Sequence, residues 1–162
     1  LVGSGIQPLP GLRHVPDAHP CRSSLTGLYS ALLASETPLV LVVACDYPFV
    51  GQDLLRRLLG AWRPGLLGVM PLGPEGCHPL LALYHRSLAP RLLQSLDAGR
   101  LRIQAALDPL RLAHLPWSSL RRLGVRPQEL WNLNTQQDLA RARQFLEDTH
   151  DPEDQDRRSD HQ

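Results

Sequence analysis

The most regular apolar stretch of the chain runs from Leu39 to Val43 and contains no polar residue. A strand with one wet face alternates apolar and polar residues, whereas a continuous apolar run is typical of a strand covered on both faces in a parallel sheet. Asp46 follows where this strand ends, and Pro48 forces a turn because its ring fixes φ and removes a backbone donor. Leucines at helical spacing then predict a helix over 52–62. The pattern is a buried strand, a carboxylate at its carboxyl end and a helix.

The same reasoning divides most of the remaining chain into short elements. Apolar residues three and four positions apart predict helices over 23–35, 88–96, 101–107 and 136–146. Thr135 and Asp138 supply a capping box for the last of these. Short apolar runs predict strands over 12–15, 66–70, 78–84 and 110–115, with a turn at 73–76 and a loop or helical turn at 117–124. Strands that alternate with helices in this way are typical of an α/β fold.

Composition limits the classes of partner. The chain has 162 residues, 43% of them hydrophobic, which is enough for one globular domain with a core. A net charge of +1 offers no electrostatic argument for nucleic acid or a membrane surface, and no apolar run approaches the ~20 residues of a spanning helix. The three cysteines match no zinc spacing and cannot all pair, which favours a reduced, cytoplasmic protein. We therefore expect neither nucleic acid nor a membrane as a partner.

The two ends of the sequence lead to separate expectations. Residue 1 is Leu, and the chain opens on L-V-G-S-G like the end of a strand entering a loop, so we expect a fragment whose N-terminal part is missing. From Glu147 onward there is no large apolar residue, and such a segment cannot bury enough surface to fold. Residues 1–146 should therefore form a partial folded domain, and residues 147–162 a polar disordered tail.

Few polar residues stand where they could do chemistry. In open α/β sheets ligands collect beyond the carboxyl ends of the strands, where Asp46 stands, and a carboxylate there suits Mg²⁺ carrying substrate phosphates. Asp17 follows a second short apolar run, His78 opens a predicted strand, and Asn132 and Asn134 stand two residues apart in a segment expected to be extended. Strand alternation would place both amides on one face. Plainer roles remain open: turns for the aspartates, a structural hydrogen bond for His78, and a loop position for Asn134.

Four segments in order resemble a known family. They are Asp17 with S-L-T-G-L-Y-S-A-L, then V-V-A-C-D-Y-P-F-V, then H-P-L-L-A-L-Y, then N-L-N-T-Q-Q-D-L-A. The ordered set is similar to the molybdenum cofactor guanylyltransferases, the MobA-like group of nucleotidyltransferases, and it covers nearly all of residues 1–146. The N-x-N-T-x-x-[DE]-L ending favours guanylyl over cytidylyl members, which tend to carry Asp there.

The resemblance implies a fold, a reaction and a set of residues. The fold would be a Rossmann-like three-layer α/β sandwich of the glycosyltransferase-A type with a mostly parallel sheet. Such an enzyme uses GTP and Mg²⁺, joins GMP to molybdopterin carrying molybdenum and releases pyrophosphate. Molybdoenzymes or other proteins of cofactor biosynthesis would be its protein partners. Asp46 matches the metal-binding Asp on which catalysis depends, Asp17 a guanosine contact, Asn132 and Asn134 a pterin-binding pair, and His78 a residue near the acceptor pocket.

Two departures from the family pattern affect the expected activity. The family opens with a glycine-rich loop and a Lys that hold the phosphates, and this sequence begins after that loop and its strand. Ser23 and Ser24 stand where the family usually has Gly-Pro. We therefore expect this stretch alone to have little or no transferase activity and to be unstable, because losing a central strand exposes unpaired edges. A degenerate binding module of the same fold and a related cytidylyl or sugar-phosphate nucleotidyltransferase remain as alternatives.

Overall fold

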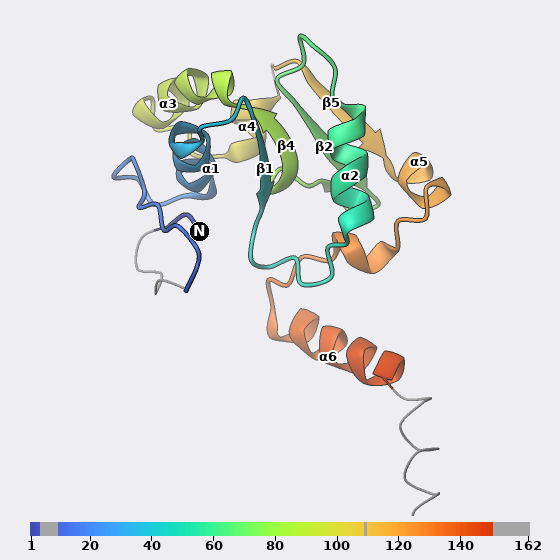
Figure 1. Cartoon of the computed structure of the whole chain (residues 1–162). Coiled ribbons are helices and arrows are strands. Elements are labelled where there is room, and N and C mark those ends of the chain that lie inside the picture. The colour runs from blue at the N-terminus through green and yellow to red at the C-terminus, as the bar shows by residue number, and fades with distance from the viewer. Residues whose placement is uncertain (4–9, 109, 151–162) are drawn as a thin grey trace, which may run out of the picture.

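A computed structural model describes residues 1–3, 10–108 and 110–150 (Figure 1). Among these residues no helix combines the length and the apolar character needed to cross a membrane. The elements are α1 (Ser24–Ala34), β1 (Leu39–Val43), α2 (Gln52–Ala61), β2 (Gly68–Gly73), β3 (Gly76–Cys77), β4 (Leu81–His85), the 3₁₀ helix η1 (Arg86–Leu88), α3 (Ala89–Asp97), α4 (Ile103–Leu107), β5 (Leu112–Pro116), α5 (Trp117–Arg122), the 3₁₀ helix η2 (Pro127–Leu130) and α6 (Gln136–His150).

The five strands form one sheet in which β4 lies between β1 and β2. The pairs β1–β4, β2–β4 and β2–β3 are antiparallel, and only β2–β5 is parallel. The expectation of a mostly parallel sheet is therefore wrong for the described strands. The reason lies in the short connection 74–80, which has no helix between β2 and β4. A connection of that length joins antiparallel strands, because a parallel pair needs a longer crossover.

β1 is less buried than its apolar sequence predicts. Its residues 39–42 are half-buried and Val43 is 38% exposed, whereas four of the five residues of β4 are buried. In the described part of the chain, β1 pairs with β4 along one edge and with no strand along the other. The continuous apolar run thus belongs to a strand at an edge of the described sheet, and the fully covered strand is its neighbour β4.

Helices cover both faces of the sheet (Figure 1). Helices α1, α3 and α4 pack on one face in a core that includes Leu25, Leu92 and the inward ring of Tyr84. Helices α2 and α5 pack on the other face in a core that includes Leu58 and Leu83. Successive residues of β4 enter opposite cores, as the two-residue period of a strand requires. The three-layer α/β sandwich is therefore confirmed.

The predicted cap of α6 is present, and α1 has a helix cap as well. Ser23 precedes α1, and its hydroxyl accepts a hydrogen bond from the Thr26 N–H at 3.2 Å. Before α6, Asp138 Oδ2 accepts from the Thr135 N–H at 2.9 Å, while the Thr135 hydroxyl accepts from the Asp138 N–H at 3.1 Å. These bonds satisfy backbone donors that have no partner within a helix. Capping thus explains Ser23, one of the two serines that depart from the family pattern.

The start of β4 differs from the sequence prediction. The strand predicted over 78–84 begins only at Leu81, because the Leu81 N–H donates to the His78 carbonyl at 3.0 Å and closes a turn. The strand predicted over 12–15 is reduced to a single parallel bridge between Val2 and Val15. His78 therefore lies in a turn, where its ring can face the sheet edge rather than one sheet face.

The end of α6 also differs from prediction. The helix continues to His150, so residues 147–150 are helical rather than part of the tail. The exposed end of a helix needs no apolar face, and here the Thr149 hydroxyl donates to the Phe145 carbonyl at 2.8 Å. Residues 151–162, and Ser4-Gly5 near the start, lie outside the described residues.

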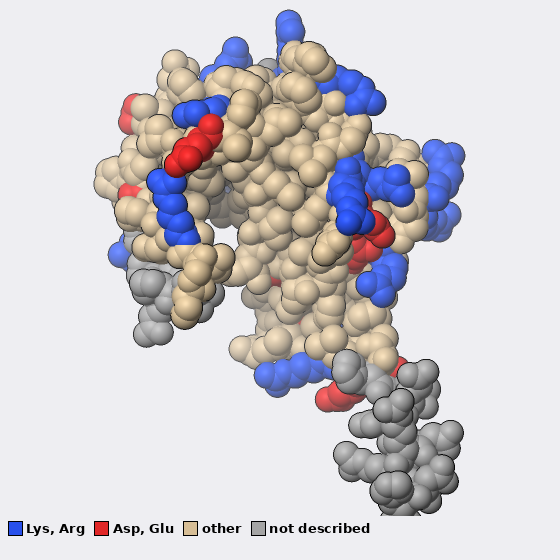
Figure 2. All heavy atoms as spheres, in the orientation of Figure 1, with Lys and Arg blue, Asp and Glu red and all other residues tan. Residues whose placement is uncertain are grey.

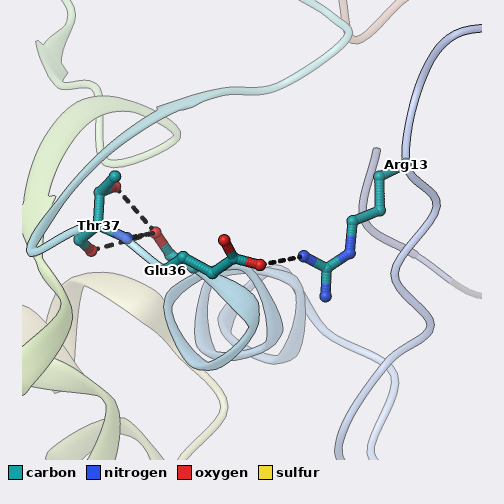
Figure 3. A network of polar contacts seen from close by, with 4 residues as sticks. Arg13, Glu36 and Thr37 are labelled. Atoms are coloured by element: carbon teal, nitrogen blue, oxygen red, sulfur yellow. Dashed lines mark hydrogen bonds and ion pairs between the residues drawn. The ribbon is translucent and has the colours of Figure 1, made fainter.

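The segment before α1 is joined to the rest of the domain by side-chain contacts. Arg13 forms an ion pair with Glu36 at 3.3 Å, beside the turn after α1 in which the Thr37 N–H donates to Ser35 Oγ at 3.2 Å (Figure 3). Both charged side chains are largely exposed, and such pairs contribute about 0–1 kcal/mol. A more buried contact is the hydrogen bond from the Ala18 N–H to Ser30 Oγ of α1, at 2.8 Å. This bond fixes the backbone next to Asp17 against α1.

Candidate functional site

Asp46 lies beyond the carboxyl end of β1, as predicted. Its carbonyl accepts a hydrogen bond from the Leu133 N–H at 2.9 Å, which holds the segment before α6 beside this strand end. Its side-chain atom Oδ1 is buried, with no hydrogen-bond partner in the part of the chain that the structure describes. Leaving a buried acceptor unpaired costs about 1–3 kcal/mol, and more for a charged group. An unpaired carboxylate oxygen at this place is therefore a candidate ligand position.

Tyr47 joins His78 and Asn132 into one polar cluster next to Asp46. The Tyr47 hydroxyl lies 3.1 Å from His78 Nδ1 and 3.4 Å from Asn132 Nδ2. Two more atoms here, His78 Nε2 and Asn132 Oδ1, are buried without a partner among the described residues. Buried polar atoms are normally hydrogen-bonded, so three unpaired ones within one cluster mark a site. Three of the five site residues expected from the sequence, Asp46, His78 and Asn132, thus come together.

Burial changes the acid–base behaviour of this cluster. Desolvation raises the pKa of the Tyr47 hydroxyl; its hydrogen bond with Asn132 opposes that rise and the Asp46 charge adds to it. Desolvation lowers the pKa of His78 below the ordinary value of 6.5, against a smaller opposing effect of Glu75. At neutral pH the cluster therefore consists of a neutral phenol, a neutral imidazole and an amide.

The lowered pKa of His78 predicts a pH dependence of stability. Below 6.5 the unfolded chain binds more protons at this residue than the folded protein, so stability falls as pH decreases through the folded pKa. We expect the free energy of unfolding to decline from neutral to acidic pH, and His78→Gln to flatten that decline. Urea unfolding at several pH values measures both slopes. Equal slopes in the two proteins would show that His78 is not held neutral by burial.

The other two predicted residues lie outside this cluster. Asn134 is exposed, and its backbone N–H donates to Asp138 Oδ2 at 3.1 Å as part of the α6 cap. The side chains of Asn132 and Asn134 therefore lie in different environments, the first half-buried and the second exposed. Asp17 lines a separate surface depression of about 440 Å³ with His19 and Arg22, in the segment that precedes α1.

A buried glutamate supports the loop that carries Asp46 and Tyr47. Glu129 of η2 is 5% exposed, and its two carboxylate oxygens each accept a backbone hydrogen bond at 3.0 Å, from Gly51 and from Arg126. Gly51 stands directly before α2, at the end of the loop after β1. An added Cβ at Gly51 would lie 2.5 Å from Glu129 Oε2, so a larger residue there would displace the carboxylate from its present position. The loop is thus fixed at both ends, by β1 and by Glu129.

An aromatic group covers the outer side of the same loop. Phe49, Trp131 and Phe145 contact one another edge to face, with ring centroids 5.3–5.8 Å apart. The Arg141 guanidinium stacks over the Trp131 ring at 4.2 Å. Asn132 and Glu75 line a small cavity of about 40 Å³ beside Trp131 and Arg141. This group anchors α6, which extends away from the sheet in Figure 1.

Sequence reasoning missed Tyr47 and Glu129. The only local signal for Tyr47 is that it follows Asp46, because its two partners lie 31 and 85 residues away along the chain. Glu129 has no local signal, since its Gly51 partner lies 78 residues earlier. Both roles arise from contacts between distant segments, which no periodicity encodes.

The residues present fit a magnesium ion bound together with a substrate. Asp46 supplies a hard oxygen ligand whose Oδ1 lacks a partner among the described residues. No group of three or more His, Cys, Asp or Glu side chains that could hold a metal occurs in that part of the chain. Mg²⁺ tolerates such a sparse donor set, because it usually keeps several waters and binds through one or two carboxylates and substrate phosphates.

Charge provides no further binding surface on the face seen in Figure 2. Arginine and acidic side chains are scattered there, and most of the central surface is uncharged. The site is therefore defined by the buried polar cluster and not by a charged patch.

Comparisons with known proteins agree with the resemblance. A family model described as a MobA-like NTP transferase domain matches residues 4–112. A molybdenum cofactor guanylyltransferase of Desulfosudis oleivorans is 30% identical over 121 residues, covering 75% of this chain and 60% of that protein. A probable molybdenum cofactor guanylyltransferase of Deinococcus radiodurans is 39% identical over 111 residues, covering 67% of this chain and 58% of that protein. The chain thus spans about three fifths of the length of these relatives.

A solved structure shows the same fold. The molybdopterin-guanine dinucleotide biosynthesis protein A from Archaeoglobus fulgidus superposes with a TM-score of 0.74 at 28% sequence identity. The match covers 83% of this chain and 68% of that one. The family model covers well over half of the sequence, and the superposition extends the match beyond it. The chain therefore belongs to the MobA-like NTP transferase family.

Proposed function

We propose that the protein is a nucleotidyltransferase of molybdenum cofactor biosynthesis, which transfers GMP from GTP to molybdenum-bearing molybdopterin and releases pyrophosphate. The observation that carries the proposal is the cluster beyond β1, where Asp46, His78 and Asn132 each hold a buried polar atom with no partner among the described residues. These are the positions that the family resemblance assigns to the metal and the acceptor. In the reaction a terminal phosphate oxygen of the acceptor bonds to the α-phosphorus of GTP, and the bond from that phosphorus to pyrophosphate breaks.

Asp46 would hold Mg²⁺ through its unpaired carboxylate oxygen. When bound, the ion supplies neutralisation of the phosphate charges during transfer. Asp46 would hold the ion at the strand end, because the backbone of Asp46 is fixed by the hydrogen bond from the Leu133 N–H. The loop that begins at Asp46 is also held at Gly51 by the hydrogen bond to Glu129.

Polar groups in two places would receive the two substrates. Asn132 and His78 offer the buried polar atoms that a pterin, rich in amide and amino groups, can satisfy. Asp17, in its separate depression, would contact the guanosine of GTP. Asn134 would contact the acceptor from the exposed side. We place the reaction in the cytoplasm, where molybdoenzymes or other proteins of cofactor biosynthesis would receive the product.

The test is an Asp46→Asn substitution in the full-length gene product. Loss of the carboxylate charge should weaken Mg²⁺-dependent binding of GTP by about tenfold, since the amide is a poorer magnesium ligand. Isothermal titration of GTP with and without Mg²⁺ measures this effect. The matched control is Asp53→Asn, the same change at an exposed residue of α2 whose carboxylate pairs with Arg56.

Three results would contradict the proposal in different ways. Absence of GTP binding by the wild type would favour a degenerate binding module of the same fold. Equal losses of Mg²⁺-dependent GTP affinity in Asp46→Asn and Asp53→Asn would show that Asp46 is only a turn residue. Preference for CTP over GTP would favour a cytidylyl or sugar-phosphate nucleotidyltransferase instead.

A further inference from the structure

We propose that Tyr47 is a positioning residue whose hydroxyl sets the ring tautomer of His78 and the amide orientation of Asn132. Through these two bonds it would determine which atoms the acceptor substrate meets: a donor at His78 Nε2 and an acceptor at Asn132 Oδ1. The inference deepens the proposed function and rests on it for the identity of the substrate. The tautomer itself is independent of any substrate.

The argument begins with the amide of Asn132. Its Nδ2 faces the Tyr47 oxygen at 3.4 Å, and an amide nitrogen can only donate, so the phenol oxygen is the acceptor of this bond. The single proton of the Tyr47 hydroxyl is then free to point at His78 Nδ1, 3.1 Å away. A neutral imidazole that accepts at Nδ1 carries its hydrogen at Nε2. One series of hydrogen bonds therefore sets the amide orientation of Asn132, the direction of the Tyr47 hydroxyl and the tautomer of His78.

The opposite chain is the only other arrangement that satisfies both bonds. In it His78 would donate from Nδ1 to the Tyr47 oxygen, and Tyr47 would donate to an amide oxygen of Asn132. The unpaired atoms would then be a bare Nε2 acceptor and an amide donor. The two arrangements present reversed hydrogen-bonding groups at the same two positions, so they would select different substrate edges. The amide orientation in the structure corresponds to the first arrangement.

Packing holds the ring of His78 where Tyr47 can reach it. The two rings meet edge to face with centroids 5.8 Å apart, and His78 is only 8% exposed. On its far side, Nε2 lies against Gly73, where an added Cβ would be 2.6 Å from that atom. The ring therefore has little freedom to turn, and the tautomer decides what it presents.

The end of β2 and the turn that follows it lie beside His78 and Asn132. Gly73 lies over His78 Nε2, and Glu75 of the same turn lines the small cavity beside Asn132. Both atoms are buried and have no hydrogen-bond partner among the described residues, so a bound acceptor would satisfy them. The substrate class that fits is a planar group with an acceptor and an N–H donor on one edge, as a pterin has.

The first experiment measures the tautomer by nitrogen-15 NMR of histidine side chains in the full-length gene product. The His78 signal is identified by its absence in His78→Gln. We expect wild-type His78 to be neutral and protonated at Nε2, and Tyr47→Phe to lose this preference while keeping the ring. The control is Tyr29→Phe, which removes the hydroxyl of another buried tyrosine, in α1. An Nδ1-protonated wild type, or an unchanged tautomer in Tyr47→Phe, would overturn the inference.

The second experiment measures binding of molybdopterin to the same proteins. Tyr47→Phe should weaken this binding by about tenfold, because the buried polar groups of His78 and Asn132 would lose the partner that orients them. An equal affinity for molybdopterin in wild type and Tyr47→Phe would contradict a positioning role. If the wild type binds no molybdopterin, the proposed function fails, while the NMR result still decides the tautomer.

Discussion

A Gly68→Ala substitution should lower the free energy of unfolding by about 3 kcal/mol, because it forces atoms into the centre of the sheet. Gly68 opens β2 and faces Tyr84 of β4 on one side and Leu112 of β5 on the other. An added Cβ would lie 2.7 Å from the Leu83 carbonyl oxygen, 2.8 Å from Tyr84 Cδ1 and 3.0 Å from Leu112 Cδ2. The first of these is backbone in a paired strand, so it cannot move without weakening the ladder.

The matched control is Gly60→Ala in α2. An added Cβ there meets no atom within 4 Å, and the position is helical. Alanine is favoured over glycine in a helix, so this change should raise stability by about 0.5–1 kcal/mol. Urea unfolding of the full-length gene product should therefore show opposite changes in the free energy of unfolding for the same substitution at Gly60 and at Gly68. An unchanged free energy of unfolding in Gly68→Ala would mean that β2 and β4 are farther apart than described.

Local pattern was sufficient where an element depends on its own residues. The apolar run of β1, the leucine spacing of α2 and the cap at Thr135 are each contained in a dozen residues or fewer, and the structure has all three. The expected mostly parallel sheet was wrong although the opposing signal was present. The absence of a helix between β2 and β4 already requires an antiparallel pair, but the apolar run of β1 and the family resemblance both favoured parallel strands.

The candidate site was predictable to a smaller extent. Asp46 could be placed at a strand end from its pattern, and His78 and Asn132 were singled out by their positions, but the roles of these two came from the likeness to a family. Their meeting depends on contacts that span the chain, such as the one between Tyr47 and Asn132, 85 residues apart. The identity of the residue that joins them, Tyr47, could not be inferred from either segment alone. The burial of β1 was overestimated for the same reason, since it depends on which strands lie beside it.

A Glu129→Ala substitution should lower the free energy of unfolding by about 3 kcal/mol, because two backbone donors would together lose the buried carboxylate that accepts their hydrogen bonds. Those donors are the N–H groups of Gly51 and Arg126, each 3.0 Å from a different oxygen of the carboxylate. Glu129→Gln keeps the shape and one acceptor oxygen, so it should cost about half as much. Chemical unfolding of the full-length gene product compares the two variants.

Glu36→Ala provides the control for Glu129→Ala, because it removes the same side chain from an exposed position. Glu36 is paired only with Arg13 among the described residues, its side chain is 89% exposed, and the loss should stay below about 1 kcal/mol. A comparable loss in both alanine variants would contradict the role assigned to Glu129. Since Glu129 fixes the loop that begins at Asp46, Glu129→Gln should also weaken Mg²⁺-dependent GTP binding although it touches neither ligand. Unchanged binding in that variant would show that the position of Asp46 depends on β1 and Leu133 alone.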